Sequence, residues 1–224
     1  MDAALEIALL WAAFTATHVG LSSLRLRPRL VGALGETGFL GLYSVIALAI
    51  FVPLMWLYFT HKHEGPALWL LPRGAALSGT LYLAMAVALI LLVAAFVTPP
   101  PSGMAPNASL TPRGVHWITR HPLVMAFVVF ALAHLLPNGF ASDVAFFGGF
   151  AAFALLSAAH QDARKRIAGP PGYGDFADAT PFFPFTGGQT LRGLRELSWI
   201  AIGGGLVLAL TIRFFHSSWF GGNP

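Results

Sequence analysis

Long apolar runs recur along this chain, and polar residues gather in the short stretches between them. Several runs reach the roughly 20 residues that a helix needs to cross a bilayer. The fourth run is shorter and fits a tilted or thinned span. The pattern predicts an all-α fold, a polytopic membrane helix bundle of about six transmembrane helices. The predicted helices are 3–22, 38–60, 75–97, 122–136, 140–159 and 197–215.

The composition supports lipid contact over much of the surface. Of the 224 residues, 56% are hydrophobic and 10% are charged, whereas a soluble domain is roughly 25% charged. No large polar block interrupts the runs, so we expect one domain over residues 1–224, with a core of about 3–190 and an extra C-terminal helix at about 197–215. The chain has no cysteine, which excludes disulfides, thiolate ligands and cysteine nucleophiles.

The positive charges are divided unevenly between the two sides of the predicted bundle. One side holds Arg25, Arg27, Arg29, Arg113, Arg120, Arg164, Lys165, Arg166, Arg192 and Arg195, and the other holds Lys62, Arg73 and Arg213. The positive-inside rule assigns the richer side to the cytoplasm, so we expect both termini outside the cytoplasm, in a bacterial inner membrane. Lysines and arginines beside the helix ends, where they face anionic lipid, account for the net charge of +4. We therefore expect no nucleic acid partner.

The longest polar segment, 161–196, joins the fifth and sixth predicted helices. Its first half carries glycine- and proline-rich turn chemistry at 169–174. Its second half is an aromatic and proline-rich stretch at 180–185. We expect this segment to lie on the membrane surface or to fold back over the cytoplasmic helix ends.

Two histidines share one predicted depth near the cytoplasmic face. His18 lies inside the first apolar run, on the same helical face as Trp11 and Ser22. An ionisable group at that depth is a functional candidate, and the alternative is a neutral histidine bonded to a neighbouring helix. His121 directly precedes Pro122, which opens the fourth helix. Histidines at matching depth on separate helices can bind one cofactor between them.

The other histidines are less well placed. We expect His160, which ends the fifth helix on the cytoplasmic side, to be a third neighbour of the site. His134 follows His121 by roughly 20 Å along a helix and points elsewhere, so the two do not share a small ligand. We expect His61 and His63 to be solvated, with only a weak metal-binding signal. No intramembrane carboxylates are paired, which argues against a proton-coupled transporter.

Five stretches in this order resemble the NnrU family of bacterial membrane proteins, over about residues 10–190. The stretches are THVGL at 17–21, GFLGLYS at 38–44, TRHPL at 119–123, AHLLPNG at 133–139 and FFGGF at 146–150. That family takes its name from a link to denitrification and nitric oxide metabolism. A relative of the family is the plastid 15-cis-zeta-carotene isomerase, an integral membrane haem b enzyme.

The resemblance implies haem b bound between His18 and His121, which would be the metal ligands and catalytic residues. Arg120, or one of the arginines at 25–29, would neutralise the haem propionates. The implied activity is cis–trans isomerisation of a lipophilic polyene, such as 15-cis-zeta-carotene, that enters from lipid.

Two other functions stay open at this point. One is a non-enzymatic haem-binding factor linked to denitrification or nitric oxide metabolism. The other is a membrane S-adenosylmethionine-dependent methyltransferase of the isoprenylcysteine type, which also carries an Arg-His-Pro step. Those methyltransferases follow the step with a glutamate pair, where this chain has Gln161 and Asp162.

Overall fold

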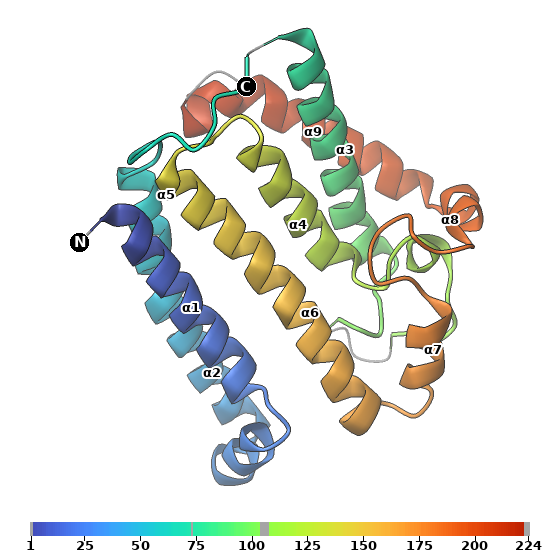
Figure 1. Cartoon of the computed structure of the whole chain (residues 1–224). Helices are drawn as coiled ribbons and strands as arrows, with labels where there is room; N and C mark the ends of the chain where they lie inside the picture. The colour runs from blue at the N-terminus through green and yellow to red at the C-terminus, as the bar shows by residue number, and fades with distance from the viewer. Residues whose placement is uncertain (1, 73, 104–107, 222–224) are drawn as a thin grey trace. The chain divides into compact units, whose positions relative to one another are not determined.

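The computed structural model describes residues 2–72, 74–103 and 108–221, and its regular structure is helical apart from an isolated antiparallel bridge between Ala67 and Phe140. The predicted all-α fold is therefore confirmed (Figure 1). The elements are α1 (Ala3–Leu21), α2 (Leu26–Thr60), α3 (Ala75–Val97), the 3₁₀ turn η1 (Gly114–Trp117), α4 (Pro122–Leu135), α5 (Ala141–Asp143), the π-helical turn η2 (Val144–Gly148), α6 (Gly149–Ala168), α7 (Tyr173–Ala179), α8 (Thr190–Glu196) and α9 (Trp199–Phe220).

The chain forms two compact units. Unit 1 comprises Met1–Leu71 and His134–Ala168, and unit 2 comprises Pro72–Ala133 and Gly169–Pro224. Each unit therefore combines segments that are far apart in the sequence. The expectation of a single domain over the whole chain stays a prediction.

Unit 1 is built around α1, which packs against α2 and α6 (Figure 1). The indole of Trp11 on α1 contacts Phe51 of α2 and Phe150 of α6. It stacks on Phe150 with ring centroids 5.5 Å apart. Gly149 allows this approach, because a Cβ atom there would lie 2.3 Å from Cδ1 of Trp11. Further along α1, His18 meets Phe153, which also lies further along α6. The two helices therefore run in the same direction.

Unit 2 contains a close pair of helices, α3 and α9 (Figure 1). Ala201 and Gly205 are buried one turn apart on α9. Small residues at this spacing let two helix backbones approach closely. A Cβ atom at Gly205 would lie only 2.5 Å from Cα of Ile90 on α3, so the contact is made by backbone rather than by interlocking side chains.

Five helical segments in the described ranges are long and apolar enough to cross a membrane: α1, α2, α3, the continuous helix Ala141–Ala168, and α9. The apolar helix α4 is shorter, at 14 residues. Large apolar side chains on α9 face outward, including Trp199 at 84% and Phe214 at 79% exposure. These properties are those of a membrane helix bundle, as the apolar runs predict.

Several helix ends differ from the prediction. α2 begins at Leu26 instead of 38, because a further helical stretch precedes Gly35, where a positive φ of 72° kinks the backbone. The fifth helix continues to Ala168 instead of 159, and so carries Arg164 and Lys165. Basic residues are compatible with the last turn of a helix, where they interact favourably with its dipole. The apolar run that predicts the helix ends at the first charged residues, whereas the helix itself continues beyond the apolar layer.

The remaining differences concern the C-terminal part. The polar segment 161–196 contains two short helices, α7 and α8, and the last helix runs over Trp199–Phe220 instead of 197–215. Arg73, which the sequence assigns to the side with fewer charges, lies outside the described residues.

Candidate functional site

His18 of unit 1 lies in a shell of aromatic rings. The centroid of its imidazole is 4.7 Å from that of Tyr43, 5.0 Å from that of Phe14 and 5.1 Å from that of Phe153. The Tyr43 hydroxyl donates to the backbone carbonyl of His18. Over the described ranges, neither ring nitrogen of His18 has a hydrogen bond. The imidazole is thus partly buried, surrounded by aromatic groups, and available as a ligand.

His160 belongs to the same unit, on α6. Its Nε2 atom is buried and has no hydrogen-bond partner, and the same is true of the Ser157 hydroxyl one turn earlier. Both residues follow Phe153, the neighbour of His18, at helical spacing. The expectation that His160 is a third neighbour of the site stays a prediction, and the sequence gave no signal for Ser157.

His121 of unit 2 stands at the start of α4 and is 2% exposed. The backbone before it is held by the aromatic and proline-rich stretch: the Arg120 N–H donates to the Pro181 carbonyl (2.9 Å), and the Thr119 hydroxyl donates to the Phe182 carbonyl (2.6 Å). The Phe182 ring meets the His121 imidazole edge-on at 5.2 Å. The stretch therefore folds back over the start of α4, and its position relative to the membrane surface stays a prediction.

The Arg120 side chain also binds the aromatic and proline-rich stretch. The guanidinium donates to the backbone carbonyls of Thr180 (2.7 Å) and Ala177 (3.2 Å), and it lies over the ring of Phe182 at 5.2 Å. The Ser102 hydroxyl donates to the Arg120 carbonyl. The sequence predicted only a charge-neutralising role for Arg120, because hydrogen bonds to distant backbone carbonyls leave no local pattern.

His116 is a second buried histidine of unit 2. It is fully buried in η1, where its Nε2 donates to the Thr98 carbonyl at 3.3 Å and its ring packs edge-on against Phe176. Its Nδ1 has no partner. Burial, more than the nearby positive charge of Arg113, lowers the pKa of His116 from 6.5 to about 4. The imidazole is therefore neutral at physiological pH.

We expect this histidine to make the protein less stable in acid. Between pH 6.5 and about 4 the unfolded chain binds a proton that folded His116 does not, so stability falls as the pH drops through this window, by up to about 3 kcal/mol. Above pH 6.5 both states are neutral at this residue and the effect vanishes. The measurement is the unfolding free energy in detergent at pH 7 and pH 5, for the wild type and His116→Gln. An equal pH dependence in the two proteins would contradict the assignment.

Asp143 of unit 1 anchors a polar cluster at the start of the Ala141–Ala168 helix. Its carboxylate is fully buried and accepts hydrogen bonds from the Tyr58 hydroxyl (3.0 Å) and from the His63 N–H (3.3 Å). The His63 ring also pairs with it through Nδ1 at 2.9 Å. Sequence reasoning missed this cluster and expected His63 to be merely solvated. The local signal was an acidic residue in the first turn of a predicted apolar helix.

The predicted site residues are divided between the two units. His18 and His160 belong to unit 1, whereas Arg120 and His121 belong to unit 2. The pairing of His18 with His121 therefore stays a prediction. No group of three or more histidine or acidic residues suited to a metal ion occurs in the described ranges.

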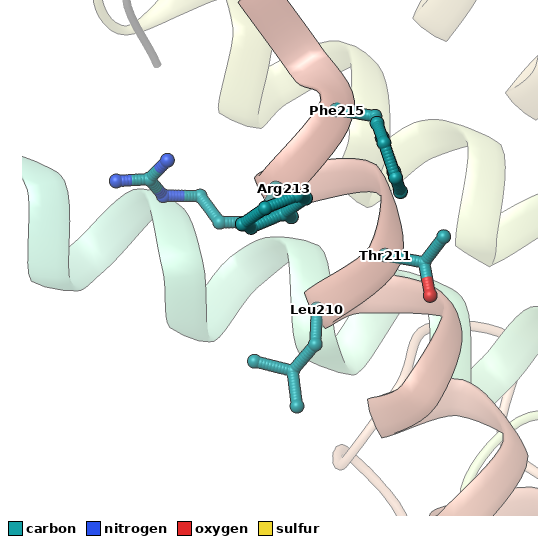
Figure 2. Close-up of a pocket in the computed structure, with 5 residues that line it drawn as sticks. Leu210, Thr211, Arg213 and Phe215 are labelled. Atoms are coloured by element: carbon teal, nitrogen blue, oxygen red, sulfur yellow. The ribbon is translucent and has the colours of Figure 1, made fainter.

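An open depression of about 700 Å³ lies on the surface of unit 2. Figure 2 shows that its lining comes from one stretch of α9, including Leu210, Thr211, Arg213 and Phe215. The Arg213 guanidinium lies over the ring of Tyr82 at 4.7 Å. A surface made by neighbouring side chains of one helix has no convergent polar groups, so it is a poor candidate for a catalytic site.

The chain matches the family model described as NnrU protein over residues 6–224. The match covers nearly the whole chain, including the last helix, and thus extends beyond the five stretches from which the resemblance was predicted. The comparisons with curated proteins and with solved structures give no match.

Proposed function

Because this chain is a member of the NnrU family, we propose that it is an integral membrane haem protein in which His18 and His121 would hold haem b. We further propose that it catalyses cis–trans isomerisation of a lipophilic polyene such as 15-cis-zeta-carotene. The membrane would supply the substrate, so the protein needs no water-filled entrance.

The surroundings of His18 are the observation that carries the haem proposal. A histidine that holds haem needs a free ring nitrogen, and an apolar surrounding suits the macrocycle. His18 meets both conditions, since its neighbours are Phe14, Tyr43 and Phe153 and its ring has no hydrogen bond in the described part of the chain. Bound haem would supply an iron centre able to polarise a conjugated polyene.

The protein's own residues would orient the second ligand. The hydroxyl of Thr119 and the guanidinium of Arg120 both bond to backbone carbonyls of the 177–185 stretch. These bonds limit the movement of the peptide that carries His121, and Phe182 covers one edge of its ring. Arg120 adds a fixed positive charge next to His121, which would favour an anionic cofactor group nearby.

The direction of α6 supports the proposed topology. Since α1 and α6 run in the same direction, an odd number of crossings must separate them. α2 and α3 supply two, and α4 is the apolar helix available for the third. If α4 is the third crossing, six spans and the positive-inside rule would place both termini outside the cytoplasm of a bacterial inner membrane, and this is the topology we propose.

The test of haem binding is the absorption spectrum of purified protein after haem-replete expression. We expect a Soret band in the wild type and its loss in both His18→Ala and His121→Ala. His134→Ala is the control for His121→Ala, because it removes a histidine of α4, and His160→Ala tests the histidine of α6 as an alternative ligand. A band that survives His121→Ala but disappears in His134→Ala or His160→Ala would reassign the second ligand. A wild type without a Soret band would reject haem and favour the methyltransferase.

The isomerase is tested separately, on haem-loaded protein. Reduced protein is incubated with 15-cis-zeta-carotene, and the product is resolved by chromatography. We expect conversion by the wild type and none by His18→Ala. Haem binding without conversion would instead favour a non-enzymatic factor for denitrification or nitric oxide metabolism.

A further inference from the structure

One face of α6 changes from aromatic to polar to cationic toward its C-terminal end. The face is formed by Phe150, Phe153, Ser157, His160 and Arg164, each three or four residues after the last. Its aromatic part packs on α1 through Trp11 and Phe14. Its polar part begins where that aromatic packing ends.

Two neighbouring side chains in the polar part have buried atoms without partners. The Ser157 hydroxyl and the Nε2 atom of His160 are both inaccessible, and neither makes a hydrogen bond. Buried polar groups in folded proteins are almost always paired with protein, water or a ligand. Two unpaired groups on adjacent turns of one helical face therefore indicate a common polar partner.

The charges around these atoms indicate the sign of that partner. Arg164 lies one turn beyond His160 and is close enough to act electrostatically on Tyr43 of α2. The acidic residue of α6 is Asp162, which lies about 140° around the helix from Ser157. The face thus combines two hydrogen-bonding side chains, Ser157 and His160, with the cation Arg164, which suits a carboxylate or a phosphate.

We propose that Ser157, His160 and Arg164 bind the anionic head group, a carboxylate or a phosphate, of an amphiphilic molecule. The hydroxyl and the imidazole N–H donate hydrogen bonds, and the guanidinium supplies the charge. The role of His160 is then to hold an anion instead of neighbouring the haem iron. The site contains neither proposed haem ligand, so it does not depend on haem. An anionic lipid head group and a haem propionate share this chemistry.

The first experiment tests the lipid source on haem-free protein. Phosphatidylglycerol is titrated into protein in zwitterionic detergent, and native mass spectrometry measures its occupancy. We expect Arg164→Gln to weaken binding by about tenfold, with a smaller loss in the same direction for the mild variant Ser157→Ala and for His160→Gln. Arg166→Gln removes the same charge from the opposite side of α6 and should change binding by less than about twofold.

The second experiment tests the propionate source. Haem b and its dimethyl ester, which lacks the propionate charges, are titrated into apoprotein and followed by the Soret band. If propionates occupy the site, the wild type and Arg166→Gln bind haem more tightly than the ester, and Arg164→Gln loses this preference. If Arg164→Gln behaves like Arg166→Gln toward both phosphatidylglycerol and haem, the anion site is disproved. Failure of haem ligation alone leaves the lipid titration unaffected.

Discussion

Replacing Gly205 with alanine is expected to destabilise unit 2 by about 3 kcal/mol or more. The new methyl group would lie 2.5 Å from Cα and 2.7 Å from the backbone nitrogen of Ile90. Because both atoms belong to the backbone of α3, no side-chain rotation relieves the clash. The two helices must separate, and they lose the contacts that join them. Unfolding in detergent, followed by circular dichroism, measures the effect.

Gly203→Ala is the matched control for this experiment. A Cβ atom at Gly203 has no atom within 4 Å, and both glycines lie in the same turn of α9. Alanine is a better helix former than glycine, so Gly203→Ala should be neutral or stabilising by up to about 1 kcal/mol. Equal effects at the two positions would show that helix propensity, and not close packing, governs the result.

Asp143→Ala is expected to destabilise unit 1 by about 3 kcal/mol or more, because it removes a buried acceptor from three donors. The Tyr58 hydroxyl would stay buried without its partner, and the loop that carries His63 would lose its attachment. The measurement is the unfolding free energy in detergent, together with proteolysis of the loop between α2 and α3.

Tyr58→Phe separates the two parts of this effect. It removes the buried hydroxyl that bonds to Asp143 but keeps the ring that stacks on Phe146 with centroids 3.9 Å apart. We expect a loss of about 1–2 kcal/mol and no change in proteolysis. Wild-type stability in Asp143→Ala would mean that this carboxylate does not anchor the loop.

The fold could be predicted because a membrane helix leaves a strong signal in sequence. α3, for example, is predicted and observed over the same residues, 75–97. The prediction was poorer where a helix leaves the apolar layer. Backbone hydrogen bonds continue through Arg164 and Lys165 in α6, although hydropathy no longer favours a helix there. The bend at Gly35 depends on a single positive φ, which nearby apolar residues do not reveal.

The candidate site could be predicted only in part. An ionisable residue inside an apolar run is conspicuous, so His18 was found by its depth alone. The partners of Asp143 come from a different helix and a loop about 80 residues away, and such tertiary pairs have no spacing rule. The shared depth of His18 and His121 stays a prediction from the six-span topology, and a pairing of the two would depend on contacts that the sequence does not encode locally.

The hydrogen bonds that hold the 177–185 stretch determine where substitutions can be tolerated. Its four acceptors are the backbone carbonyls of Ala177, Thr180, Pro181 and Phe182. Every residue type offers a carbonyl, so the stretch can change many side chains and keep these bonds. Three of these four bonds come from the side chains of Thr119 and Arg120, which have no such freedom, since valine has no donor and glutamine lacks the guanidinium fork. The bond to Pro181 comes from the backbone N–H of Arg120. The attachment therefore depends mainly on the side chains of Thr119 and Arg120. An engineered chain could vary the side chains of the 177–185 stretch and still keep His121 in position.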